Sequence, residues 1–206
     1  DIACDAHSVE GALEIASLPI CVSAVDPKLF IDAVKAGASL IEIGNFDSFY
    51  EQGIFFSASE VIALTNETKD LLPNIPLSVT VPHTLSLDKQ VDLAIQLVNI
   101  GADIIQTEGG KSSKPYSSGI NGFLEKSIPT LAATYAIRQE FDKNSIDQPI
   151  MSASGLSQIT CPLAISCGAS AVGVGSVINK VDDLVGMIAG VRGLKESLDN
   201  SLITQK

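Results

Sequence analysis

Two short apolar runs in the last third of the sequence each end in serine and glycine. The first ends at Ser154-Gly155 and the second at Gly175-Ser176, and a helical pattern follows each, with Ser157 as a plausible N-cap of the first. Helix N-termini carry partial positive charge and backbone N–H groups without an internal partner, which suits a phosphate. We therefore predict that Ser154, Gly155, Gly175 and Ser176 bind a phosphate or similar anion. Glycines that only form tight turns are the alternative.

A second group of side chains could transfer protons. Glu108 lies at the tip of an expected strand, beside a glycine-rich loop, and is the first candidate for a general acid or base. Aligning the glycine-led repeats puts Gln106 and Glu42 on the same strand face as Glu108. Glu42 lies deeper, where a structural network with Ser, Thr and Gln is its alternative role. His83 follows another strand tip, where it could shuttle protons near neutral pH or cap the next helix.

The loop 109–122 is long for a connection between a strand and a helix, and it is rich in glycine and serine. Loops of this kind often act as lids over a site. Lys111 and Lys114 could then close on an anion, so Lys111 joins the candidate ligand-binding residues. A flexible surface loop is the alternative interpretation.

Metal and nucleotide motifs are weak or absent in the sequence. Asp1 and Asp5, with Glu42 or Glu108 near them, could hold Mg²⁺, but no ligand spacing supports this, and we expect no metal. No Ser-His-Asp order, P-loop or dinucleotide fingerprint occurs, and the cofactor stays unknown. The four cysteines form no Cys-x-x-Cys pair and are expected to be reduced and packed as small apolar groups.

Internal repeats show which elements must position these residues. Gly37-Ala38-Ser39, Gly101-Ala102-Asp103 and Gly168-Ala169-Ser170 each precede an expected strand, 64 and 67 residues apart. Glycine there suits a left-handed residue just past a helix C-terminus. The alternate strands begin with Pro19, Pro76 and Pro149 instead, a position where proline is accepted. Repeated strand–helix units predict an α/β fold with a parallel sheet.

The expected helices have recognisable boundaries. Ser57 and Glu60 form a capping-box pattern, and Pro129 interrupts a long run, so that this helix is expected to kink or begin there. The expected helical ranges are 9–17, 58–72, 86–99, 123–141 and 181–198.

Counting strands predicts a (β/α)8 TIM barrel. Six complete strands are expected, and residues 1–5 resemble the C-terminal end of one more strand. A closed barrel needs eight strands and about 250 residues, so we expect the first βα unit to be missing from this sequence. Residues 1–206 are then a single domain with a polar tail at 199–206. On this count the two Ser-Gly tips follow strands seven and eight, where barrels commonly bind phosphate.

Composition limits the classes of partner. The 206 residues are 46% hydrophobic and 18% charged, with a net charge of −11. This charge excludes a basic nucleic-acid-binding surface and disfavours an anionic membrane. No apolar run approaches the roughly 18 residues that span a bilayer. A small phosphorylated metabolite is the expected partner, and homo-oligomerisation stays open.

Three blocks of the sequence resemble a known family. The sequence resembles the hypothetical chloroplast open reading frame twenty-three family of algal plastids and cyanobacteria in Ile41-Glu42-Ile43-Gly44-Asn45-Phe46-Asp47-Ser48-Phe49-Tyr50, Leu77-Ser78-Val79-Thr80-Val81-Pro82-His83-Thr84-Leu85 and Ile104-Ile105-Gln106-Thr107-Glu108-Gly109-Gly110. Residues 153–157 and 172–179 continue the match. The resemblance covers essentially the whole sequence. It implies a TIM barrel of the ribulose-phosphate-binding type and a location in the plastid, in the chloroplast stroma. It implies no activity.

Two functions follow as hypotheses. The first is an enzyme, of lyase, isomerase or synthase type, that acts on a phosphorylated small molecule with Glu108 as acid or base. The second is a non-catalytic barrel that senses or binds a phosphometabolite or flavin mononucleotide at the same edge, or serves as a scaffold.

Overall fold

The computed structural model describes residues 1–109 and 113–203. The chain divides into two compact units, residues 1–105 and 106–206, and each is described by itself. None of the helices in the described residues combines the length and the apolar run that crossing a bilayer requires.

Strands and helices alternate through both units. The first unit contains β1 (Ile2–Ala3), α1 (Ala6–Ile15), β2 (Cys21–Ala24), α2 (Leu29–Lys35), β3 (Leu40–Ile43), α3 (Asp47–Tyr50), α4 (Ala58–Leu71), β4 (Leu77–Thr80) and α5 (Leu87–Ile100). Strand β5 (Ile104–Thr107) spans the boundary between the units. The second unit continues with α6 (Gly119–Lys143), β6 (Ile150–Ala153), α7 (Cys161–Ser166), β7 (Ala171–Gly173), α8 (Ser176–Asn179) and α9 (Leu184–Ile203).

The strands follow one another in the sheet in the order β1 to β7, the same order as in the sequence. The pairings β1–β2, β2–β3, β3–β4 and β6–β7 are all parallel. Consecutive parallel strands joined by helices are the arrangement of a TIM barrel. All six predicted strands, and the short strand predicted within residues 1–5, are confirmed.

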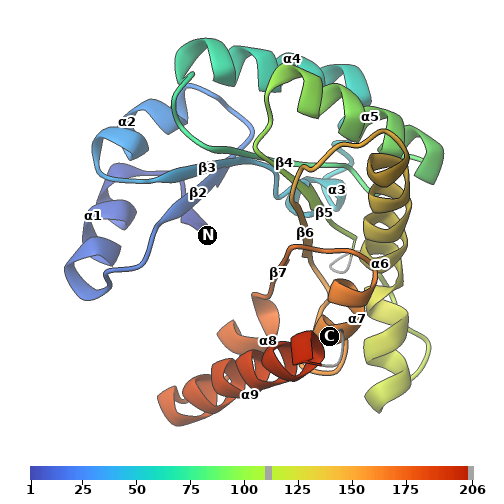
Figure 1. Cartoon of the computed structure of the whole chain (residues 1–206). Helices are drawn as coiled ribbons and strands as arrows, with labels where there is room; N and C mark the ends of the chain where they lie inside the picture. The colour runs from blue at the N-terminus through green and yellow to red at the C-terminus, as the bar shows by residue number, and fades with distance from the viewer. Residues whose placement is uncertain (110–112, 204–206) are drawn as a thin grey trace. The chain divides into compact units, whose positions relative to one another are not determined.

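Alternation along the strands of the first unit separates two faces. Val22, Ile41, Ile43, Leu77 and Val79 are fully buried. Figure 1 shows α1, α2, α4 and α5 along one side of β2, β3 and β4, where they cover this apolar face. The other face carries polar side chains, because successive residues of a strand point to opposite sides.

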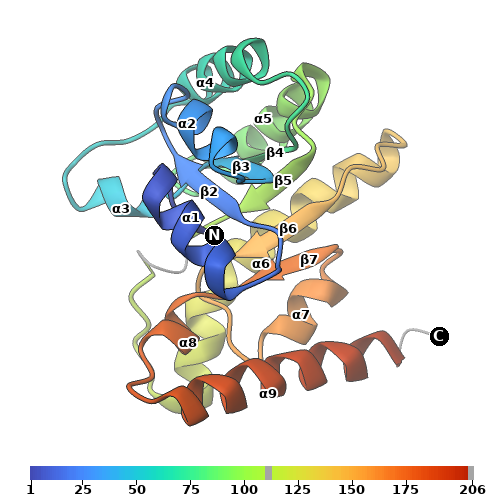
Figure 2. The ribbon, with the colours of Figure 1, turned by 90° about the vertical axis from the view of Figure 1, so that its left-hand side faces the viewer.

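Local rules explain several helix ends. Gly37, Gly101 and Gly168 have φ of 115°, 108° and 96°, which confirms the left-handed position predicted from the repeats. The capping box of Ser57 and Glu60 is present at the start of α4. In the second unit, α7 and α9 lie side by side (Figure 2).

Three helices differ most from their predicted ranges. Helix α1 spans Ala6–Ile15, so it begins and ends earlier than the predicted range 9–17. Helix α6 begins at Gly119 and continues through Pro129, although a start or kink was expected at the proline. Buried residues on both sides of Pro129, such as Ser127, Thr130 and Ala133, keep the helix packed despite the missing N–H. Helix α9 continues to Ile203, so residues 199–203 of the polar tail are helical.

Candidate functional site

The two Ser-Gly turns of the second unit follow neighbouring strands. Ala153 at the end of β6 lies opposite Gly173 at the end of β7 in a parallel register. The turns at 154–155 and 175–176 therefore leave the same edge of the sheet. Leu156 follows the first turn directly and is buried in an apolar cluster. Val174 and Ile178, which lie on either side of the second turn, pack against the same cluster.

The backbone at the first turn has an unusual conformation. Ser154 has φ of 69° and Gly155 has φ of 75°. Glycine adopts positive φ freely, whereas an L-residue in this region costs about 1–2 kcal/mol. A residue held at such a cost is a reasonable starting point for a functional hypothesis. The two left-handed residues turn the backbone sharply at the strand tip.

The second turn is open to solvent. Gly175 is exposed, and a Cβ atom added there would meet no atom within 4 Å. Across the described part of the chain, no backbone carbonyl accepts a hydrogen bond from the amide of Gly155 or of Gly175. The Gly175 carbonyl, in contrast, accepts from Ile178 and Asn179 in α8.

Ser157 is not the N-cap of the following helix, and this prediction was wrong. Helix α7 begins at Cys161 with Thr160 as its N-cap and Pro162 in its first turn, a position that proline favours. The Ser157 amide donates to Thr160 Oγ1 at 2.9 Å instead. The predicted anion site would therefore use the turn after β6 and the start of the short helix α8, in place of two helix N-termini.

Glu108 belongs to the second unit and is buried, with 4% of its surface exposed, directly after β5. Its neighbour Thr107 faces α6, because Thr107 Oγ1 lies 2.6 Å from Thr130 Oγ1 and 3.2 Å from Thr134 Oγ1. Alternation then puts Gln106 and Glu108 on the opposite face of the strand, as the sequence predicted.

A buried hydroxyl network on the helix side of the sheet was missed. Thr134 donates to Ser152 Oγ at 3.0 Å, and Thr130 donates to the Ala153 carbonyl at 2.6 Å. The network ties α6 to β5 and β6, next to Glu108 and to the first turn. Threonines four residues apart in a helical run were the available signal.

The described part of the long loop is tied to α6. Glu125 accepts hydrogen bonds from the Tyr116 amide at 2.7 Å and from the Ser117 amide and hydroxyl at 3.0 and 2.6 Å. The hydrogen bonds from Ser117 lower the pKa of Glu125. Lys114 is exposed, whereas Lys111 lies outside the described residues, and its predicted role stays a prediction.

In the first unit, the polar face of the sheet carries Glu42. Its carboxylate is buried and accepts a hydrogen bond from Thr80 Oγ1 at 2.9 Å. Ser23 and Ser78 are its register partners on β2 and β4. A Cβ atom on Gly44 would overlap both Glu42 Oε1 and Thr80 Oγ1, so a side chain there would displace the hydrogen-bonded pair. Of the network with Ser, Thr and Gln that was predicted as the alternative role of Glu42, the threonine bond is present. The roles of Glu42 stay a prediction.

His83 pairs with an aspartate that the sequence did not single out as a site residue. His83 Nδ1 lies 3.6 Å from Asp47 Oδ1, and Asp47 is buried with 6% exposure. The ring of Tyr50 meets the imidazole edge to face at 5.2 Å. Helix α5 has Ser86 as its N-cap, so His83 does not cap it. A carboxylate beside Nδ1 can orient an imidazole for proton transfer at Nε2.

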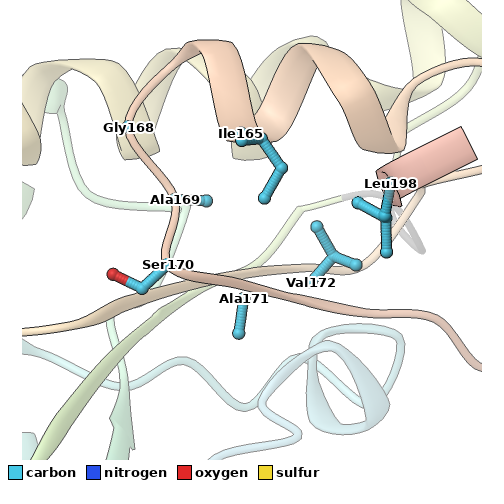
Figure 3. A pocket seen from close by; sticks show the side chains of 7 residues that line it. All are labelled: Ile165, Gly168, Ala169, Ser170, Ala171, Val172 and Leu198. Carbon is cyan, nitrogen blue, oxygen red and sulfur yellow. The ribbon is translucent and has the colours of Figure 1, made fainter. Parts of the chain in front are cut away.

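A hollow of about 460 Å³ opens in the second unit, at the other end of β7 (Figure 3). Its lining carries no titratable side chain and consists of Ile165, Gly168, Ala169, Ser170, Ala171, Val172 and Leu198. The hollow therefore lacks groups for acid–base chemistry, and the strand tips stay the candidate site.

Comparison with known proteins identifies the family. The family model described as "Protein of unknown function (DUF561)" matches residues 1–204. The chain belongs to the DUF561 family. A relative of the DUF561 chain, "Uncharacterized protein ycf23" of Porphyra purpurea, is 38% identical over 201 residues, which cover 98% of this chain and 74% of the relative. The resemblance to the chloroplast open reading frame is thus confirmed, and ycf23 genes are plastid-encoded in algae.

Solved structures similar to the DUF561 chain support the fold. A 3-hexulose-6-phosphate synthase matches with a TM-score of 0.62 and 17% identity, over 94% of this chain and 80% of that one. The aldolase QR15 matches with a TM-score of 0.60 and 18% identity, over 97% and 81%. At such identities the likeness concerns the fold alone. The predicted TIM-barrel class of the DUF561 chain is confirmed.

Proposed function

We propose that this chain binds a small phosphorylated metabolite in the plastid stroma, with the phosphate at the turns after β6 and β7. The backbone amides of Gly155, Gly175 and Ser176 would donate to the phosphate oxygens, with the Ser154 and Ser176 hydroxyls beside them. The observation that carries the proposal is the parallel register of Ala153 and Gly173, since it brings both turns to one edge.

The proposed chemistry is acid–base catalysis on the bound metabolite. Glu108 of the second unit would be the acid or base, and Gln106 shares its strand face. In the first unit, His83 with Asp47 stays a separate candidate pair for proton transfer. A lyase, isomerase or synthase reaction fits these groups. The solved structures with a similar fold include an aldolase and a sugar-phosphate synthase by name, which agrees with this class.

A charge-reversal variant tests the phosphate site. Gly175→Asp adds a carboxylate where a side chain meets no atom within 4 Å, so the fold should be retained. We expect inorganic phosphate or sugar phosphates to raise the melting temperature of the wild type in a concentration-dependent way. The same ligands should leave the melting temperature of Gly175→Asp unchanged, because the new charge repels the phosphate.

Gly11→Asp is the matched control, because Gly11 is also exposed and a Cβ there also meets no atom within 4 Å. This variant should respond to phosphate as the wild type does. The proposal is wrong if no phosphate compound stabilises the wild type, or if Gly175→Asp is stabilised as strongly as Gly11→Asp.

A further inference from the structure

Three potential metal ligands from three strand regions of the first unit meet on the polar face of the sheet. Ligand atoms of Asp1, Cys21 and Glu42 all lie within 4.8 Å of one another. Ile2 is the register partner of Val22, so Asp1 lies beside Cys21, and Ser23 of the same strand is the partner of Glu42. The sequence predicted no metal here, because about twenty residues separate each ligand from the next.

Two hydroxyl groups beside this cluster give independent support for a ligand. Ser78 is fully buried, and its Oγ atom has no hydrogen-bond partner among the described residues; the same holds for the Oγ atom of Ser23. Ser23 and Ser78 are the register partners of Glu42 on its two sides. Ser78 shares its strand face with Thr80, whose hydroxyl donates to Glu42. Buried hydroxyls without a partner require an explanation, such as an ion or its bound water.

The donor set selects the kind of metal. Mg²⁺ and Ca²⁺ take oxygen ligands, whereas Zn²⁺ takes cysteine sulfur together with carboxylate oxygen. We propose that Asp1, Cys21 and Glu42 bind one Zn²⁺ ion, with Ser23 and Ser78 holding a water in its fourth position. Three protein ligands and a water are the composition of an open zinc site. The hydrogen bond from Thr80 orients the Glu42 carboxylate, as outer partners of metal ligands commonly do.

A metal ion can reach the site from solvent, because Asp1 is exposed and Cys21 is half-buried. It uses none of the residues proposed to hold the phosphate, and zinc binding is measured without any phosphate compound. Failure of the zinc proposal is therefore distinguishable from failure of the proposed function.

The test is calorimetric titration of ZnCl₂ into the full chain after treatment with a chelator. We expect one Zn²⁺ per chain, and a loss of affinity of roughly tenfold or more in Cys21→Ser and in Asp1→Asn. Asp1 is exposed, so Asp1→Asn keeps the test valid if Cys21→Ser fails to fold. Ser78→Ala should weaken binding by up to roughly tenfold through the water.

Cys167→Ser is the matched control, since Cys167 is a free, half-buried thiol in the second unit and should not affect zinc affinity. Substitution by Co²⁺ gives a second readout, a thiolate-to-cobalt absorption band that Cys21→Ser should abolish. The proposal is overturned if the wild type binds no Zn²⁺, or if the affinity is the same in wild type, Cys21→Ser and Asp1→Asn. A loss in Cys167→Ser equal to that in Cys21→Ser would also overturn it, as unspecific binding to thiols.

Discussion

The two units offer different kinds of chemistry at their strand tips. In the first unit, side chains carry it: Glu42 with Thr80 on one face of the sheet, and His83 with Asp47 after β4 and β3. In the second unit, apart from Glu108, the main chain carries it, at turns built from serine and glycine. Because the net charge is −11, no general field attracts a phosphate, so the proposed phosphate site depends on local amides.

Buried hydroxyl groups differ between the units in the same way. In the second unit, Thr107 and Ser152 on the strands form hydrogen bonds with Thr130 and Thr134 of α6. In the first unit, Ser23 and Ser78 lie on the opposite face of the sheet, with hydroxyls that have no partner among the described residues. Satisfied hydroxyls on the helix side indicate a structural role. The hydroxyls without a partner beside Glu42 are those that the proposed zinc site would use.

The largest expected effect follows from Glu108→Gln. An acid or base at this position contributes typically 10²–10⁴-fold to a rate, so turnover of the phosphorylated substrate should fall by about that factor. Affinity for the phosphate ligand should change little, because the proposed phosphate contacts come from the main chain of other strand tips. Steady-state kinetics and calorimetry on the same preparation separate the two effects.

The non-catalytic alternative makes the opposite prediction for this pair of measurements. A sensor or scaffold has no turnover to lose, and Glu108→Gln would then change only ligand affinity or stability. Turnover that survives Glu108→Gln at the wild-type rate would remove Glu108 from the catalytic role.

A matched pair of glycine variants compares the two strand tips directly. Gly44→Ala should reduce the free energy of unfolding by about 1–3 kcal/mol, because the methyl group overlaps Glu42 Oε1 and Thr80 Oγ1. Gly175→Ala should change it by less than about 0.5 kcal/mol, because its methyl group enters open space. Urea unfolding of both variants measures the difference. Equal losses of unfolding free energy in the two variants would mean that the surroundings of Gly44 and Gly175 are equally crowded.

The sequence predicted the features that depend on neighbouring residues. The strand positions follow from repeated glycine and proline starts, and the capping box of Ser57 and Glu60 follows from their spacing. Gly101 needs a left-handed conformation at the end of α5, and its φ of 108° agrees. The alternation that put Glu42 with Thr80 on the polar face needs only the strand period.

The features that depend on distant residues could not be predicted in this way. The pairing of Asp47 with His83 joins residues 36 positions apart, and the choice of partner depends on how α3 turns back toward β4. Helix α6 passes through Pro129 because packing outweighs the local cost of proline. The cluster of Asp1, Cys21 and Glu42 depends on strand register, which a single sequence does not specify.

A smaller effect is expected from Thr134→Val in the second unit. Valine keeps the shape but removes a hydroxyl that donates to the Thr130 carbonyl at 2.7 Å and lies 3.0 Å from Ser152 Oγ. The free energy of unfolding should fall by about 1 kcal/mol, the usual net value of a hydrogen bond. Phosphate affinity should stay at the wild-type value if the network is only structural. A loss of affinity without a loss of stability would instead connect this network with the turn after β6.

The smallest effect concerns the thiol of Cys21 at alkaline pH. Burial, followed by the charge of Glu42, raises the pKa of Cys21 from 9.0 to about 12. The unfolded chain therefore loses this proton first as the pH rises. The contribution of Cys21 to the free energy of unfolding is fully present below pH 9.0 and declines toward pH 12.

The variant Cys21→Ser tests this pH dependence, because serine does not titrate in this window. With a chelator present, the stability of the wild type relative to Cys21→Ser should fall by less than about 1.4 kcal/mol per pH unit. In the second unit, burial also raises the pKa of Cys167, so Cys167→Ser should show an effect of the same sign. If the difference between wild type and Cys21→Ser stayed constant with pH, the thiol of Cys21 would be as well solvated in the folded chain as in the unfolded one, and the polar face around Glu42 would be wetter than its burial indicates.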